Sequence, residues 1–305
     1  MSALFDTVVT VDWSARATPS PRKPSPDAIW WAVARRRGRS VVLEEPVYVR
    51  TRAEACKRLA ALLAMERAAG RRVLAGFDFP FGYPRGTARR LTGRAEALAL
   101  WEWLGERIQD APDNANNRFA VAAAINRHFA GVGPLWGRPV QCDEPDVPTT
   151  GRVREPDDHP PERRLVEMRV VRAQPCWKLY TTGSVGSQAL LGLPALARLR
   201  GDRRLSGLQV WPLETGLTAP KAPLVLAEIY PSLLGPRLKA VREEGEVLDA
   251  VQVRETAKAL ARLDAEARLA PLFTPDLSPT ERTIVAREEA WILGVGFEAA
   301  LRGAP

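Results

Sequence analysis

The sequence predicts an α/β protein built on a mixed β-sheet that is flanked by helices. The first observation is a set of short apolar runs rich in β-branched residues, which are typical of strands buried on both faces. The second is their order, because three strands come first and a long helical segment then leads to a fourth. A hairpin-like meander followed by a helical crossover gives antiparallel and parallel pairs in one sheet.

Residues 1–81 are expected to form the first half of this domain. Pro46 indicates a bulge or an edge position in the third strand. Gly70 suits the C-terminal cap of the helix that follows it in the predicted order. The elements are strands at residues 7–14, 28–34, 41–49 and 73–79, and a helix at residues 51–69.

Residues 82–175 break the alternation, and we interpret them as a helical and loop insertion after the fourth strand. Helical spacing occurs at 92–108 and 117–129. The segment 131–161 is rich in Pro, Gly and Asp and reads as one long loop. Loops of that length in compact domains are usually functional or disordered, and covering the site as a lid is one role for this one.

The sheet pattern resumes in residues 176–305, the second half of the domain. Ser278, Pro279 and Glu281 form a capping box with proline at the first helical position, which predicts the start of the last helix. The expected elements are helices at 185–200, 247–269 and 279–293 and strands at 208–212 and 224–230.

Three of the apolar runs end in an acid: Asp12, Asp78 and Glu228. Burying an unpaired carboxylate is costly, and parallel strands bring their carboxyl ends to one edge of the sheet. Asp249, in the first turn of the helix 247–269, is a fourth candidate. Carboxylate-only sites suit Mg²⁺ or Mn²⁺. The competing interpretation is that each acid caps a turn and pairs with one of the 44 basic residues.

A second candidate segment lies before the helix 185–200. Exposed amides at a helix N-terminus bind anions, and Lys178, Ser184 and Ser187 would add a charge and two hydroxyl groups. We therefore consider these three residues for phosphate binding. An ordinary serine cap explains the same residues, and the spacing of a P-loop is absent.

The strand-end acid Asp12, together with the segments Phe77–Gly82, Ala227–Pro231 and Asp249–Ala250, resembles the ribonuclease H-like fold. More narrowly, these segments are similar to a widespread, little-characterised bacterial family of predicted nucleases. The resemblance covers the strands and the last two helices, and it leaves out residues 83–175. It implies metal-binding carboxylates at Asp12, Asp78, Glu228 and Asp249 and a divalent-metal nuclease activity.

One departure from that family concerns Trp13, which with Ser14 follows the first acid where the family usually has glycine. A bulky side chain there is expected to narrow the cleft. Proteins that resemble this chain sometimes carry a label for molybdopterin-guanine dinucleotide synthesis. The residues do not support that role, because the N-terminal region has no glycine-rich nucleotidyltransferase loop.

Three functions remain open from the sequence. The first is hydrolysis of nucleic acid by a Mg²⁺- or Mn²⁺-dependent nuclease. The second is an ATP-dependent phosphotransferase of the actin-like fold, which needs a glycine-rich turn after the first strand that Trp13–Arg16 does not provide. The third is a nucleic-acid-binding protein without catalysis, which leaves the acids unexplained.

Composition bounds these functions only broadly. The net charge of +8 favours a phosphate-rich partner, although a bias toward Ala, Arg and Pro produces the same charge. The three cysteines form no zinc or disulfide pattern, and His128 and His159 are the only histidines, which disfavours zinc chemistry and a His-dependent triad. With no apolar run of membrane-spanning length and no secretory signal, we expect a cytoplasmic protein.

Overall fold

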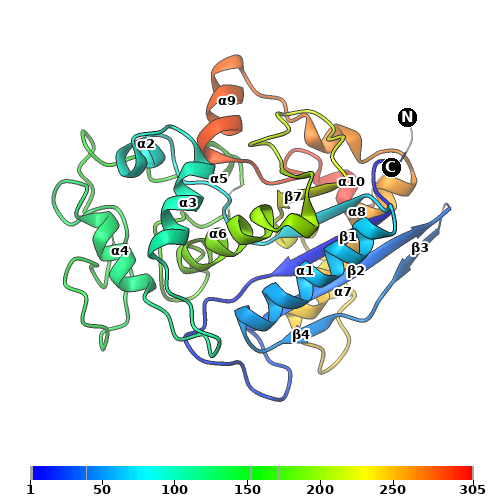
Figure 1. The fold of residues 1–305 in the computed structure, drawn as a ribbon, viewed down its shortest axis with the longest axis horizontal. Helices are drawn as coiled ribbons and strands as arrows, with labels where there is room; N and C mark the ends of the chain where they lie inside the picture. Colours follow the sequence, from blue (N-terminus) through cyan, green and yellow to red (C-terminus); the bar gives the residue numbers. More distant parts are fainter. Residues whose placement is uncertain (1–2, 39, 152, 171, 304–305) are drawn as a thin grey trace.

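The computed structural model describes residues 3–38, 40–151, 153–170 and 172–303 (Figure 1). Within these residues the chain forms a seven-stranded mixed sheet, and helices lie on both of its faces. The strand order is β3-β2-β1-β5-β7-β6, and β4 also pairs with β2. The strands are β1 (Thr7–Asp12), β2 (Ile29–Arg37), β3 (Ser40–Leu43), β4 (Val47–Val49), β5 (Val73–Phe77), β6 (Leu208–Val210) and β7 (Leu224–Glu228). The predicted α/β class with a mixed sheet is confirmed.

The antiparallel half of the sheet is the predicted meander. β2 pairs antiparallel with β1, and β3 and β4 both pair antiparallel with β2. The third strand was expected to be continuous from 41 to 49, but the structure divides it into β3 and β4. Pro46 lies in the gap, where its missing N–H cannot contribute to the ladder.

The parallel half begins after the crossover helix α1 (Arg52–Ala68), which is capped by Thr51 and followed by Gly70 at a φ of 70°. β5 lies parallel to β1, β7 lies parallel to β5, and β6 forms the parallel edge. Val11 is opposite Phe77, and Phe77 is opposite Glu228. The carboxyl ends of β1, β5 and β7 therefore meet along one edge of the sheet.

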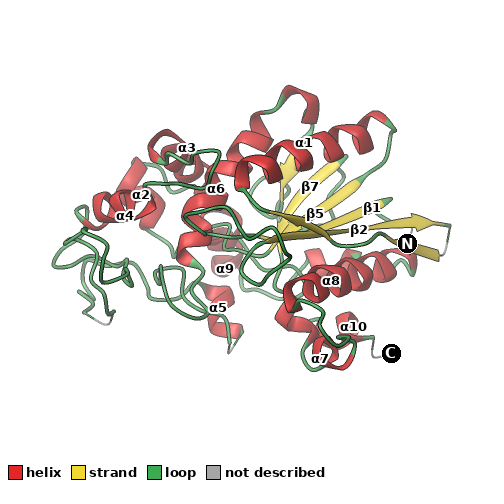
Figure 2. Ribbon diagram, turned by 90° about the horizontal axis from the view of Figure 1, so that it is seen from below, coloured by secondary structure: helices red, strands yellow, loops and turns green. Residues whose placement is uncertain are grey.

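Two apolar layers cover the sheet (Figure 2). One buried cluster joins Val9, Val11 and Phe77 to α1 and to α6 (Gly186–Gly201). The other joins the opposite side of the same strands to α8 (Leu248–Ala265), which contacts β1 and β2. Adjacent residues of a strand therefore face different helices, as the alternation of side chains requires.

The helices between β5 and α6 are α2 (Thr87–Thr92), α3 (Ala97–Arg107), α4 (Arg118–Asn126) and α5 (Leu165–Arg169). Of these, α3 and α4 pack against α6 and α2 packs against α3, whereas Val166 of α5 belongs to the apolar cluster on the α8 side. The helix expected at 92–108 begins later, at Ala97, because Gly93, at a φ of 76°, ends a separate short helix at Thr92 that was not predicted. Between 127 and 164 the described residues form neither helix nor strand, in line with the predicted long loop.

The last predicted helix is shorter than expected. The capping box of Ser278 and Glu281 is present, but the α-helix ends at Ile284 and a π-helical turn, η4 (Val285–Glu289), follows. Ala290, at a φ of 56°, then redirects the chain. The remaining helices are α7 (Arg237–Ala240), α9 (Pro279–Ile284), α10 (Glu298–Arg302) and the 3₁₀ turns η1 (Arg203–Leu205), η2 (Pro231–Leu234) and η3 (Ala270–Phe273). Over the described residues, none of the helices combines the length and apolarity needed to cross a bilayer.

Glu66 joins the crossover helix α1 to the sheet. Its fully buried carboxylate accepts hydrogen bonds from Thr7 in β1 (2.6 Å), Arg35 in β2 (2.9 Å) and Arg71 (2.6 Å). Burial opposes its ionisation, but these hydrogen bonds prevail and lower the pKa of Glu66 to about 2.

Glu66→Gln is expected to reduce the free energy of unfolding by about 3 kcal/mol at neutral pH, because it leaves buried donors without their anion. A lowered folded pKa gives stability that is present above the unfolded pKa of about 4.3 and is lost as the pH falls toward 2. Urea unfolding at pH 7 and pH 3 should therefore show a smaller difference between variant and wild type at pH 3. An equal difference at both pH values would contradict this role.

Candidate carboxylate site at the sheet edge

Asp12 and Asp78 lie side by side on neighbouring parallel strands. Asp12 is the last residue of β1, and Asp78 follows the last residue of β5. The main-chain N–H of Asp78 donates to the carbonyl of Val11 at 2.9 Å, which continues the ladder to the strand ends. Thr10, two residues before Asp12 in β1, donates its hydroxyl to the carbonyl of Val253 in α8 at 2.6 Å. By alternation, Asp12 and Asp78 therefore lie on the α8 side of the sheet.

Asp249 comes to the same place from α8. It lies in the first turn of that helix, where the helix dipole favours a negative charge. One of its oxygens, Oδ2, accepts the main-chain N–H of Asp27 at 2.9 Å, which ties the loop before β2 to the helix. The structure therefore brings together three of the four predicted acids and adds Asp27 beside them.

Burial and mutual repulsion act together on the pKa values of these acids. Burial raises the pKa of Asp12 well above its ordinary value, and repulsion from Asp78, Asp249 and Asp27 raises it further. Burial likewise raises the pKa of Asp78 to about 8, with further repulsion from Glu228 and Asp249. The pKa of Asp249 is raised chiefly by burial, against the Asp27 hydrogen bond. The carboxyl groups of Asp12, Asp78 and Asp249 therefore each resist ionisation in the absence of a cation.

The two strand-end aspartates have no protein partner among the described residues. Within the described part of the chain, the carboxylates of Asp12 and Asp78 form neither a hydrogen bond nor an ion pair with another residue. Both side chains are half-buried and remain reachable by solvent. Asp78, but not Asp12, lines a small pocket of about 30 Å³ that has room for a water molecule and whose wall also includes Arg164 and Glu228.

Glu228 lies at the same sheet edge, but its carboxylate has a different environment. It is opposite Phe77 in the register, so alternation directs it to the face opposite Asp78. Arg164 donates to both of its oxygens, at 2.6 and 2.8 Å, and the main-chain N–H of Phe81 donates to one of them at 2.8 Å. Glu228 is only 2% exposed. Glu228 is close enough to repel Asp78, but its carboxylate already has a cationic partner, so it differs from the other three predicted metal ligands.

Trp13 also differs from expectation. Its ring packs against Phe77 and Phe79, with centroids 6.4 and 6.1 Å away, and only 2% of the residue is exposed. It belongs to the buried cluster on the α1 and α6 side of the sheet, whereas Asp12 faces α8. The tryptophan therefore contributes to the core and does not narrow the space around the aspartates.

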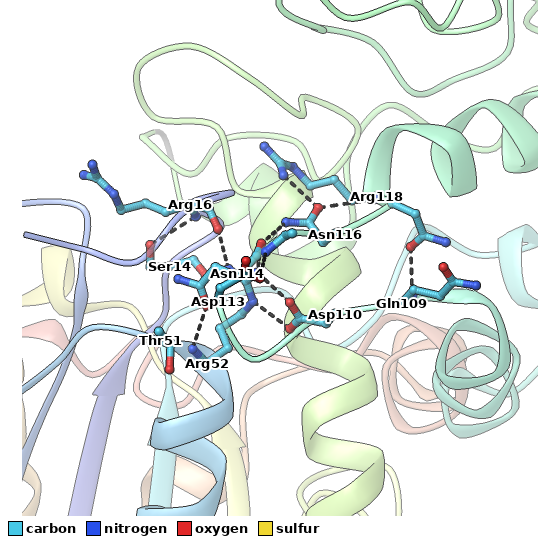
Figure 3. A network of polar contacts seen from close by, with 12 residues as sticks. Ser14, Arg16, Thr51, Arg52, Gln109, Asp110, Asp113, Asn114, Asn116 and Arg118 are labelled. Atoms are coloured by element: carbon cyan, nitrogen blue, oxygen red, sulfur yellow. Dashed lines mark hydrogen bonds and ion pairs between the residues drawn. The ribbon is translucent and has the colours of Figure 1, made fainter.

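The loop that leaves Asp12 is held by a buried arginine (Figure 3). Arg52, at the start of α1, donates to the carbonyls of Ser14 at 3.1 Å and Arg16 at 2.7 Å. Its other nitrogens form a bidentate pair with Asp110 at 2.6 and 2.7 Å. Asn114, at a φ of 73°, accepts the main-chain N–H of Arg52 at 2.9 Å. This network fixes the chain immediately after Asp12.

The predicted phosphate-binding residues are close in sequence but have different partners. Lys178 donates to the carbonyl of Thr182 at 2.9 Å. Ser187, 3% exposed, donates to the carbonyl of Leu179 at 2.6 Å. Ser184 does not cap α6, whose N-cap is Val185. The serine cap considered from the sequence is therefore absent, and Ser187 alone of the three makes a buried contact at the start of α6.

Sequence reasoning did not identify Arg164, Arg118 or Asp27. Arg164 lies in the insertion, and its partner Glu228 is 64 residues away, so no local pattern connects them. Arg118 is buried through tertiary packing at the start of α4, and Asp27 is an exposed loop residue. No local sequence pattern marks these three residues, because their roles depend on contacts between distant parts of the chain.

The carboxylates of Asp12 and Asp78 suit an ion such as Mg²⁺, which keeps several water ligands, better than a metal held entirely by protein side chains. Among the described residues, no three His, Cys, Asp or Glu side chains are placed so that they alone could hold a metal ion. Mg²⁺ keeps several waters and is usually bound by one or two carboxylates together with substrate phosphates. Two adjacent carboxylates without partners meet that requirement.

Comparisons with known proteins give no further guidance. The chain matches no protein-family model, no curated protein and no solved structure. The function must therefore be argued from the residues at the sheet edge.

Asp78→Asn is expected to stabilise the metal-free protein at high pH. A carboxyl whose folded pKa is about 8 costs stability as the pH rises from about 4 to 8, because the folded state holds the proton that the unfolded state loses. The asparagine removes that cost, and we expect a gain of about 0.5–2 kcal/mol at pH 9 and a smaller one at pH 5. Thermal unfolding in EDTA at both pH values measures it, and a variant less stable than wild type at pH 9 would contradict the repulsion described above.

Proposed function

We propose that the protein is a Mg²⁺- or Mn²⁺-dependent nuclease that hydrolyses phosphodiester bonds of nucleic acid. The observation that carries the proposal is the pair Asp12 and Asp78, two adjacent half-buried carboxylates with no partner among the described residues. Surface acids are usually solvated, and buried acids are usually paired, as Glu228 is. Asp12 and Asp78 are neither fully solvated nor paired, which suggests that their partner is a bound cation.

The residues would have distinct roles. Asp12 and Asp78 would hold the ion, and Asp249 would complete the site or orient the attacking water. A bound Mg²⁺ or Mn²⁺ would activate water and stabilise charge on the phosphodiester oxygens. The anionic substrate supplies the remaining ligands, which accounts for the small number of protein donors. The Arg52 network keeps the strand end rigid while substrate binds.

The topology supports the same proposal. A three-stranded meander, a helical crossover and a parallel strand, with acids on the first and fourth predicted strands, are what the resemblance to ribonuclease H-like nucleases implies. The late helix α8 brings its own acid, Asp249, to the end of these strands. The net charge of +8 is also suited to a polyanionic substrate.

Mn²⁺ is expected to raise the thermal stability of the wild type and of Glu228→Gln, but not of Asp12→Asn or Asp78→Asn. At a Mn²⁺ concentration 100 times the dissociation constant, the gain should be about 2.7 kcal/mol. Glu228→Gln is the matched control, because it changes an acid at the same edge that already has an arginine partner. Scanning calorimetry with Mn²⁺ and with EDTA measures the shift.

The same four proteins should be incubated with labelled single-stranded DNA and RNA in Mn²⁺. Cleavage by wild type that is absent from both aspartate variants is the expected result. Stabilisation by ATP rather than by Mn²⁺ alone would favour a phosphotransferase, and strand binding that is indifferent to EDTA without any cleavage would favour a non-catalytic role. Mn²⁺ stabilisation that persists in both aspartate variants would overturn the proposed site.

A further inference from the structure

Arg118 is a buried cation without a counter-ion. It is the first residue of α4 and is 8% exposed. Its side chain donates to the hydroxyl of Ser187 at 3.0 Å and to the side-chain oxygen of Asn116 at 2.8 Å, and both acceptors are neutral. Among the described residues it forms no ion pair, and its nitrogen Nη2 makes no hydrogen bond. The guanidinium also stacks on the ring of Phe119, 4.5 Å from its centroid, but no negative charge of the described residues balances it, and burying such a charge is costly unless an anion binds.

The nearby acid cannot serve as that anion. Asp110 is engaged by Arg52 through both carboxylate oxygens. Burial and repulsion from Arg52 lower the pKa of Arg118 to about 10, so the guanidinium stays protonated near neutral pH. Its electrostatic environment therefore favours an added negative charge.

The surroundings of Arg118 are suited to a phosphate group. Its partner Ser187 is the second residue of α6. Among the described residues the amides of Ser187 and Gln188 have no acceptor, whereas the Gly186 amide donates to the carbonyl of Lys178 at 2.9 Å. In Figure 3 the guanidinium groups of Arg118 and Arg16 extend on the same side of the polar network, away from Arg52 and Asp110. The Arg16 side chain forms no hydrogen bond or ion pair with any described residue.

A short chain of contacts connects this position to the aspartates. Gln188, next to Ser187, donates its side-chain amide to the carbonyl of Trp13 at 2.7 Å. Trp13 follows Asp12 directly in the chain. The start of α6 therefore contacts the main chain that leaves Asp12, and Arg118 contacts the same helix start through Ser187.

We propose that Arg118, together with the free amides of Ser187 and Gln188 at the start of α6, binds a backbone phosphate of the nucleic-acid strand whose phosphodiester is cleaved at Asp12 and Asp78. This inference rests on the proposed function, which it deepens by naming the residue that holds the strand. It also moves the phosphate contact from Lys178 and Ser184, which the sequence suggested, to Arg118 and the α6 amides near Ser187.

The test is fluorescence anisotropy of a short labelled single-stranded oligonucleotide in EDTA, so that binding is measured without metal or cleavage. Arg118→Gln is expected to weaken binding about tenfold or more, because it removes a charged hydrogen-bond donor. It should also reduce the slope of log K against log salt by about 0.7, the value for one phosphate contact on a single strand. Arg127→Gln is the control, since Arg127 ends the same helix, is exposed and pairs with Asp146.

Melting temperatures in sulfate and in chloride show whether Arg118→Gln is folded and whether it has lost an anion site. Sulfate should raise the melting temperature of the wild type above that in chloride of equal ionic strength, and Arg118→Gln should lose this increment. Removing a buried cation that lacks a counter-ion is expected to leave the melting temperature in chloride unchanged or higher. Unaltered affinity and salt slope in Arg118→Gln, or no sulfate effect on the wild type, would overturn the inference.

The two proposals can fail separately. If Mn²⁺ does not stabilise the wild type but strand binding still depends on Arg118, the nuclease proposal falls and the phosphate contact stands. If Mn²⁺ stabilisation depends on Asp12 while Arg118→Gln binds the oligonucleotide as the wild type does, the metal site stands and the phosphate contact falls.

Discussion

The parallel pairing of β1 with β5 places two like charges on neighbouring strand ends, and the candidate site depends on that constraint. Thr7 is opposite Val73 and Val11 is opposite Phe77, so Asp12 and Asp78 emerge together. Both flanking structures hold this edge in place: Arg52 fixes the loop after β1, and Thr10 joins β1 to α8. The strands cannot separate the two carboxylates without breaking the ladder, so the repulsion has to be met by protonation or by a cation.

Glu228 is a neighbouring acid whose negative charge the protein neutralises with its own arginine. Its carboxylate is one register position away from Asp78, on the other face of the sheet, and Arg164 from the insertion binds both oxygens. Arg164 also binds Glu167 and the carbonyl of Glu289, so the insertion, the strand β7 and the turn after α9 are joined in one buried network. The chain has 44 basic residues, yet none of those described pairs with Asp12 or Asp78.

Much of the sheet could be predicted because its signals are local. The β-branched runs, Thr51 as a helix cap and Pro46 as a strand break each act on residues close by in the chain. The same is true of the strand-end position of Asp12 and Asp78. The facing of Glu228 was not predictable in this way, since it depends on the exact register of β7 against β5, where one residue moves a side chain to the other face. The burial of Arg118 and the pairing of Arg164 arise from contacts 64 or more residues apart, for which a single sequence carries no signal.

The central claim is that Asp12 and Asp78 share a divalent cation. Crystals soaked in Mn²⁺ and measured near the manganese absorption edge locate that ion directly through its anomalous scattering. The account predicts an anomalous peak between the carboxylates of Asp12 and Asp78, within coordination distance of both. A peak only at other acidic residues, or an arginine turned in to pair with these two aspartates, would contradict it.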